Sequence, residues 1–278
     1  MGHWNVTESF TVQKASYDRF AEIQNRIRYS KEDTVSISLN TQARFGYSFA
    51  HLFATLPHLA CKYDKKLLLS CNLRTHKLFQ NQSLINHNCC FNPGSDYSAE
   101  LSKNVRTLTD LSDIMKMIGN IAVEAPVMMN AKLAGLFISM TGEMYNNAWE
   151  HSGGIVFGST CFRNKNKTYC FSCYDMGIGI TEKVKNHIHS ITDDIPALQW
   201  ALTPGNSTSK ETSRGLGFTT LKSFAKANEG AIRICSGKVM YSFDAKKGEL
   251  YHRLDNKFIG TLFEMDIIAD KNRTYILK

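Results

Sequence analysis

The sequence predicts an α+β fold, with a small α/β module over residues 1–100 and a larger domain over residues 101–278. Two observations support this prediction. Strand-like and helix-like runs alternate in the first part, whereas the second part has long helical segments followed by a series of strand-like runs. The length of 278 residues fits one large domain or two modest ones.

Four segments define the first part. Residues 17–28 have a helical pattern, and residues 34–39 alternate in polarity as a strand does. Residues 45–61 are long and apolar enough for a buried helix, and residues 66–71 are typical of a buried strand. The polar residues 87–100 predict a linker or a long loop.

The second part begins with helical segments. We expect one helix over about residues 104–122 and another that has Pro126 in its first turn and runs through residues 128–149. Five strand-like runs follow, over residues 154–162, 168–174, 231–235, 239–243 and 261–268. Polar residues 164–167 predict a hairpin turn. The expected architecture is a largely antiparallel sheet with helices packed on one face.

Composition excludes several classes of protein. Hydrophobic residues make up 43% of the chain and charged residues 21%, which excludes long disorder, collagen and coiled coil. The 33 Lys and Arg residues exceed the 25 Asp and Glu residues, which gives a net charge of +8. These basic residues are dispersed rather than clustered, so nucleic-acid binding is not expected.

The cysteines do not indicate a metal site or a disulfide scaffold. Eight cysteines are sparse in a chain of this length, and Cys170 and Cys173 form a C-x-x-C pair without a second pair at zinc-site spacing. The first residues lack a signal-peptide profile, and no stretch approaches the roughly 18 apolar residues of a membrane span. We therefore expect a soluble, cytoplasmic protein with reduced thiols and no membrane partner.

An acid and an amide lie one helical turn apart near the end of the 128–149 helix. Glu143, Asn147 and Glu150 share one face of that helix at about 100° per residue. A carboxylate can take a proton from an attacking water, and an amide oxygen is a hard ligand suited to Mg²⁺. The alternative is an ordinary solvent-facing polar stripe.

A second motif follows the 168–174 strand. Asp175 stands at the strand end and is followed by Gly177 and Gly179. The carboxylate can accept a hydrogen bond from an exocyclic amine, and glycines let the backbone approach a flat ligand. The alternative is a simple turn.

A third motif combines a polar loop with a glycine-bearing helix start. The loop over about residues 203–214 contains Lys210 and Arg214 and runs into Gly215-Leu216-Gly217. Free N–H groups at a helix start favour phosphate, and the two basic side chains would add positive charge. The alternative is a surface loop in front of a capped helix.

The fourth motif, Gly260-Thr261, opens the last strand-like run and gains its meaning from its position after the other three. In this order, the motifs resemble those of the Bergerat-fold ATPases, the superfamily of DNA gyrase, heat-shock chaperone ATPases, sensor histidine kinases and MutL. The resemblance covers about residues 105–268 and implies a two-layer α/β sandwich that binds ATP and Mg²⁺.

The resemblance also implies roles for individual residues. Glu143 resembles the general base, and Asn147 resembles the Mg²⁺ ligand. Asp175 resembles the carboxylate that reads the adenine amino group, with Gly177 and Gly179 shaping that wall.

The remaining motif residues match the phosphate and adenine ends of the site. Gly215, Leu216 and Gly217 resemble the phosphate-facing segment after the ATP lid, which would span about residues 203–214 with Lys210 and Arg214. Thr261 resembles the threonine that supports the adenine contact through water.

None of the nine histidines has the setting of a phosphoacceptor helix, so the chain is a poor match to a sensor kinase. It is more similar to anti-sigma serine kinases and to stand-alone bacterial ATP-binding proteins, which are often paired with STAS-like partners. The strand–helix–strand order of the first part itself resembles a STAS-like module.

Three functions remain open. The first is an enzyme that hydrolyses ATP or transfers its γ-phosphoryl group to a protein. The second is a nucleotide-controlled switch with little turnover, in which ATP sets the interface with a protein partner or a second copy. The third, a DNA-associated ATPase, requires a clustered basic face that the sequence does not display.

Overall fold

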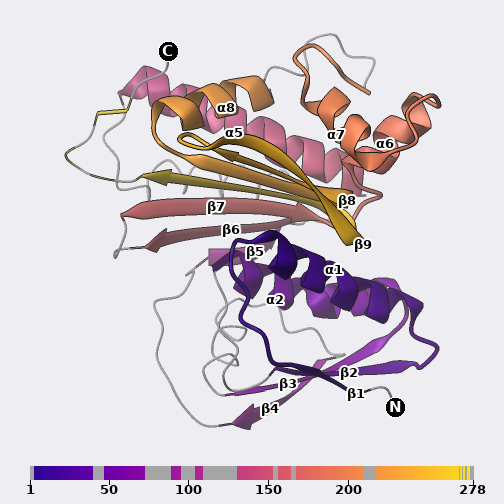
Figure 1. Cartoon of the computed structure of the whole chain (residues 1–278). Helices are drawn as coiled ribbons and strands as arrows, with labels where there is room; N and C mark the ends of the chain where they lie inside the picture. The colour runs from indigo at the N-terminus through magenta and orange to yellow at the C-terminus, as the bar shows by residue number, and fades with distance from the viewer. Residues whose placement is uncertain are drawn as a thin grey trace.

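Two β-sheets and the helices packed against them form the part of the chain described by this computed structural model (Figure 1). The structure describes residues 3–39, 47–72, 89–94, 104–108, 130–152, 156–163, 167–208 and 217–268, together with residues 270, 272, 274 and 275. The expected α+β class is confirmed, because one sheet is parallel and the other is antiparallel.

The first sheet has four parallel strands in the order β1-β2-β3-β4. Two helices, α1 and α2, alternate with its first three strands along the chain. The elements are β1 (His3–Val6), α1 (Lys14–Tyr29), β2 (Thr34–Leu39), α2 (Tyr47–Lys62), β3 (Lys66–Asn72) and β4 (Cys89–Gly94).

The second sheet has five antiparallel strands in the order β5-β6-β7-β9-β8. Its strands are β5 (Asn104–Leu108), β6 (Val156–Arg163), β7 (Thr168–Asp175), β8 (Ala231–Asp244) and β9 (Gly248–Ile268). The helices of this part are α5 (Ala131–Ser152), α6 (Ile180–His187), α7 (Asp194–Leu202) and α8 (Gly217–Ala227).

Figure 1 shows α1 and α2 between the two sheets, with α5 and α8 on the opposite face of the antiparallel sheet. The ring of Phe20 on α1 lies 5.5 Å from that of Phe53 on α2 and 5.9 Å from that of Phe258 on β9. One hydrophobic core therefore joins the parallel sheet, its two helices and the near face of the antiparallel sheet.

The apolar pattern of this region follows from its place between two sheets. In β2 the side chains of Val35, Ile37 and Leu39 are buried and alternate with half-buried ones. In α2 every residue from 51 to 57 is buried, because a helix covered on both sides by sheets has no wide solvent face.

Residues 89–94 form a strand, so our expectation of a loop there was wrong. β4 pairs in parallel with β3, from Leu67 opposite Cys89 to Asn72 opposite Gly94. Asn, Pro and Gly disfavour strands locally, but Pro is tolerated in an edge strand, and the backbone of β3 supplies the pairing. The rest of the expected linker lies outside the described residues.

The expected helix over residues 104–122 was also wrong at its start. Asn104–Leu108 is the edge strand β5, paired with β6 from Asn104 opposite Thr160 to Leu108 opposite Val156. Strand pairing in the sheet overrides the weak local preference of this segment. Residues 109–129, with Pro126, and residues 164–166 of the expected hairpin turn lie outside the described part of the chain.

The last two strands are longer than expected. The runs 231–235 and 239–243 belong to the single strand β8, whose pairing with β9 shifts register at Ser236, Gly237 and Val239. β9 begins at Gly248 rather than at residue 261. The carboxylate of Asp244 accepts hydrogen bonds from the N–H groups of Lys246 and Lys247, which stabilises the turn between the strands.

Candidate functional site

A pocket lies between the far face of the antiparallel sheet and the helices α5, α6, α7 and α8. Its volume of about 200 Å³ exceeds the roughly 150 Å³ of a cavity that accepts benzene. Five residues of α5 line it at spacings of three and four: Met140, Glu143, Met144, Asn147 and Ala148.

The structure brings Glu143 and Asn147 onto the pocket wall but leaves Glu150 outside it. Glu150 is exposed, whereas the apolar residues Met144 and Ala148 line the pocket beside Glu143 and Asn147. The wall of α5 is therefore half apolar, which suits a ligand with both an aromatic and a charged part.

The sheet forms the floor of the pocket. Asp175, the last residue of β7, is 3% exposed, and its Oδ1 atom accepts a hydrogen bond of 2.7 Å from the N–H group of Gly177. Burial raises the pKa of this carboxyl to about 7, although Gly177, Thr261 and the positive charge of Lys62 oppose the shift. Asp175 thus changes its charge near neutral pH.

Thr261 stands beside Asp175 on the neighbouring strand, and the two residues are directly paired in the ladder between β7 and β9. Thr261 lowers the pKa of the Asp175 carboxyl through its N–H and hydroxyl groups. Its Oγ1 atom also accepts a bond of 3.2 Å from the N–H of Ile180. Thr261 therefore ties the carboxylate to the first residue of α6.

Two glycines with positive φ allow this close approach. Gly260 has φ +81°, and a Cβ atom there would lie 1.9 Å from the carbonyl oxygen of Asp175. Gly179 has φ +88°, and its Cβ atom would lie 2.7 Å from Oγ of Ser236. No other residue type fits these positions without moving the backbone around Asp175.

We predict that Gly260→Ala lowers the free energy of unfolding by about 3 kcal/mol, because strain at positive φ adds to a backbone clash. Gly205→Ala is the matched control, since Gly205 has φ +82° and no heavy atom near its Cβ position. It should cost only about 1 kcal/mol. Urea unfolding measures both, and equal losses would contradict the clash.

Glu143 lies against the start of α8. A Cβ atom on Gly217, the first residue of that helix, would lie 2.1 Å from Oε2 of Glu143. The absence of a side chain at Gly217 therefore leaves room for the carboxylate beside the positive end of the α8 dipole. The same helix start is suited to a phosphate group.

Five of the predicted site residues line this one pocket: Glu143, Asn147, Asp175, Gly217 and Thr261. Gly177 and Gly179 form the turn from β7 into α6, beside Asp175 and Gly260 respectively. Lys210, Arg214, Gly215 and Leu216 lie outside the described residues, as do residues 209–216 of the predicted lid and helix start.

Sequence reasoning missed the wall made by α6 and α7, which contributes Ile180, Lys183, Val184 and Trp200. Two signals were present. Ile180, Lys183 and Val184 have helical spacing directly after Gly179. Asp193 precedes α7 as an N-cap, and its side chain accepts a bond of 2.9 Å from the N–H of Ile195.

Within the described ranges, no group of three or more His, Cys, Asp or Glu side chains is placed to hold a metal ion. Mg²⁺ needs no such cage, because it usually keeps several waters and binds through one or two protein oxygens together with substrate phosphates. The amide of Asn147, on the pocket wall one turn from Glu143, fits that mode of binding.

Comparison of the chain with protein-family models and with curated proteins finds no match. Among the described helices, none combines the length and the apolar character needed to cross a bilayer.

Proposed function

We propose that the pocket binds an adenine nucleotide with Mg²⁺ and that the chain is a Bergerat-type ATPase or phosphotransferase. The observation that carries this proposal is the convergence of residues from four separate elements. Glu143 and Asn147 on α5, Asp175 on β7, Gly217 on α8 and Thr261 on β9 meet in one pocket. The sequence motifs alone did not require these elements to be neighbours.

The chemistry of each end of the pocket supports a nucleotide. The buried Asp175 carboxylate, when ionised, can accept a hydrogen bond from an exocyclic amine, and the apolar side chains of Met144, Ile180 and Phe218 suit a planar base. The start of α8 at Gly217 suits the phosphates. Bound Mg²⁺ would be held by the Asn147 amide and would neutralise developing charge on the phosphates.

Glu143 would act as the general base of the reaction. Its carboxylate takes the proton of the attacking water, or of a protein hydroxyl, as that oxygen forms its bond to the γ-phosphorus. The bond between the γ-phosphorus and the bridging oxygen breaks, and the nucleoside diphosphate leaves with the electron pair. The start of α8 beside Glu143 stabilises negative charge on the transferring group.

A nucleotide-controlled switch is the second candidate. It is favoured by the contacts that α1 and α2 make with the backbone beneath the pocket, since such contacts can couple a ligand to a partner surface. A protein partner or a second copy of the chain would bind differently to the nucleotide-bound and nucleotide-free forms. A STAS-like identity of the first 100 residues stays a prediction, as does the DNA-associated alternative.

We predict that Asn147→Ala weakens the binding of MgADP by at least about tenfold. Mutation of a residue that only hydrogen-bonds to a metal ligand lowers metal affinity by about 10- to 100-fold, and loss of the ligand itself should cost at least as much. Binding of ADP in EDTA should not change. Asn146→Ala is the matched control, because Asn146 is exposed on the same helix and does not line the pocket.

Isothermal titration with MgADP, ADP in EDTA and MgGDP tests both the site and the proposal. Binding of MgADP but not of MgGDP by the wild type supports an adenine site. Equal Mg²⁺ dependence in Asn147→Ala and Asn146→Ala would exclude Asn147 as the ligand. If the wild type binds no adenine nucleotide, the proposed function is wrong.

A further inference from the structure

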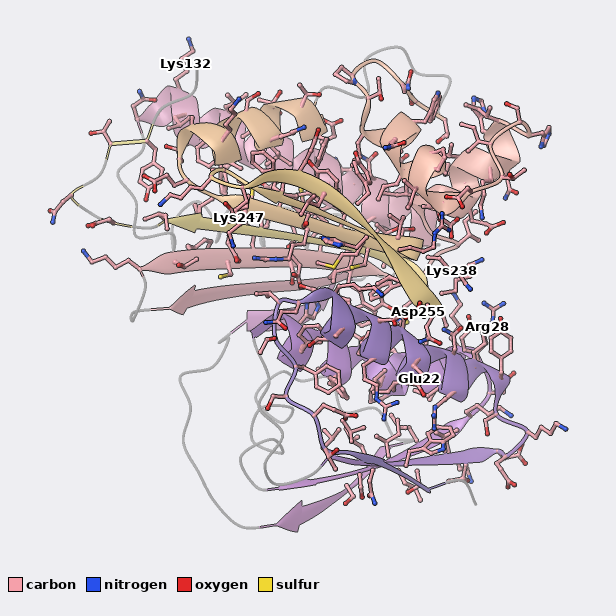
Figure 2. All side chains as sticks on the ribbon, in the orientation of Figure 1. Glu22, Arg28, Lys132, Lys238, Lys247 and Asp255 are labelled. Atoms are coloured by element: carbon pink, nitrogen blue, oxygen red, sulfur yellow. The ribbon has the colours of Figure 1, made fainter. Side chains whose placement is uncertain are left out.

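The N-terminal helix α1 is hydrogen-bonded to a short stretch of β9 that leads directly to the pocket. Oδ1 of Asp18 accepts a bond of 2.8 Å from the N–H of Asn256, and Nδ2 of Asn25 donates one of 2.7 Å to the carbonyl of Lys257. An ion pair of 3.5 Å joins Lys14 of α1 to Asp255, which Figure 2 shows at the junction of β9 with α1. The side chains of α1 thus follow the β9 backbone toward Thr261.

Gln24 makes the last of these contacts, at the irregular part of the sheet. Its Oε1 atom accepts a bond of 2.9 Å from the N–H of Ile259, and its Nε2 atom donates one of 3.3 Å to the Ile259 carbonyl. Nε2 also donates to the hydroxyl of Tyr174 at 2.8 Å. Gln24 is fully buried, so these bonds are shielded from water.

The position of Ile259 explains why a side chain must supply its partners. The register of β8 with β9 jumps from Ser236 opposite Thr261 to Gly237 opposite Phe258, which leaves Ile259 and Gly260 outside the ladder. A buried peptide group that lacks a ladder partner needs another. The amide of Gln24 fills that need for the Ile259 N–H and shares the Ile259 carbonyl with the hydroxyl of Tyr174, which donates a bond of 3.1 Å to it. Gln24 so holds the segment that carries Gly260 and Thr261.

A second contact comes from α2. The ammonium group of Lys62, the last residue of that helix, donates a hydrogen bond to the carbonyl oxygen of Met176. Met176 lies between Asp175 and Gly177, in the turn that places the buried carboxylate. The two N-terminal helices therefore contact both backbone segments at the Asp175 end of the pocket, one on β9 and one after β7.

We propose that Gln24 and Lys62 are positioning residues through which the N-terminal helices hold the Asp175–Gly177 turn and the Ile259–Thr261 segment in their binding conformation. The role in base recognition rests on the proposed function, whereas the restraint on the two backbone segments does not. Neither residue lines the pocket. Each acts through the backbone that it bonds, and the positive charge of Lys62 in addition lowers the pKa of Asp175.

Gln24→Met and Lys62→Met test the proposal, because methionine has the length of glutamine, is one atom shorter than lysine, and lacks the amide and ammonium groups that make these bonds. Glu22→Gln is the matched control: Glu22 lies on α1 (Figure 2) and pairs within that helix with Arg19 and Arg26. Lys62→Arg should restore the bond to Met176. Lys62 is exposed overall, so its variants keep the test available if Gln24→Met does not fold.

The first measurement is hydrogen exchange without ligand. Gln24→Met should speed exchange of the Ile259 amide by about tenfold or more, and Lys62→Met should speed exchange of the Gly177 amide to the same extent. A tenfold change corresponds to about 1.4 kcal/mol, which is within the usual cost of leaving a buried polar group without its hydrogen bond. Glu22→Gln and Lys62→Arg should match the wild type. Unchanged exchange in both methionine variants would overturn the proposal, whether or not a nucleotide binds.

The second measurement compares adenosine with inorganic triphosphate as probes of the two ends of the pocket. We expect each methionine variant to weaken the binding of adenosine by about tenfold and to leave the binding of triphosphate unchanged. Only the end of the pocket assigned to the base is held by these contacts. An equal loss for both probes would indicate general destabilisation and overturn the role in base recognition. A wild type that binds neither probe would refute the proposed function, and the exchange data would still decide the restraint.

Discussion

Glu143→Gln should reduce ATP turnover by about 10²- to 10⁴-fold, the usual contribution of a general base. Glutamine keeps the size of the side chain against Gly217 but cannot accept the proton of the nucleophile. MgADP binding should stay within about twofold of the wild type, because Glu143 is assigned to the chemical step rather than to binding. Single-turnover kinetics with excess enzyme measures the chemical step directly.

Glu150→Gln is the control for this experiment, because Glu150 is exposed on the same helix and lies outside the pocket. Its turnover should equal that of the wild type. If Glu143→Gln retains full turnover, Glu143 is not the base. If the wild type binds MgADP but turns over no ATP, the switch becomes the leading function.

Asp175→Asn should weaken adenosine binding by about 10- to 100-fold, because a hydrogen bond to a charged group is worth about 1.5–3 kcal/mol. Adenosine is the better probe here, since it has no phosphate group that titrates near neutral pH. Titration calorimetry at pH 8 measures the loss. An unchanged affinity would show that Asp175 does not read the base.

The same residue should make binding depend on pH. Since burial raises the pKa of Asp175 to about 7, the carboxyl takes up a proton below that pH and loses its charge. Adenosine affinity should then fall by up to about tenfold per pH unit below 7, and it should be flat in Asp175→Asn. The nearby charged and titratable groups are Lys62 on α2, Glu143 on α5, Lys183 on α6, and the buried Cys173 and Tyr174 on β7.

Through Asp175, stability and adenosine affinity should depend on pH in opposite directions. A carboxyl with a raised pKa in the folded state binds more protons folded than unfolded, so it lowers stability as the pH rises from about 4 to about 7. Asp175→Asn should therefore unfold at an equal or higher urea concentration than the wild type at pH 8. Loss of binding together with loss of stability would instead indicate a structural role.

Local sequence patterns were sufficient to predict the elements whose conformation depends on their own residues. The alternation of Val35, Ile37 and Leu39 in β2 indicated its strand, and the spacing of Glu143 and Asn147 placed both on the pocket wall of α5. Asp175 and the glycines after it were visible at a strand end, and the positive φ of Gly179 explains why glycine stands at that position.

Tertiary structure decided the remainder. β4 and β5 are strands because β3 and β6 present backbone partners to them, and no local pattern encodes a partner that is distant along the chain. The packing of α1 and α2 against the second sheet was equally invisible, since an apolar helix face does not specify which surface covers it.

Gln24 shows most clearly the difference between what the sequence indicates and what the tertiary structure determines. In the sequence it is one polar residue in a helix, with nothing to distinguish it from an exposed one. In the structure it is fully buried and supplies the hydrogen bonds that the irregular register of β8 and β9 denies to Ile259. The sequence by itself determined which residues could form the site, whereas their convergence and support came from strand pairing and packing between segments far apart in the chain.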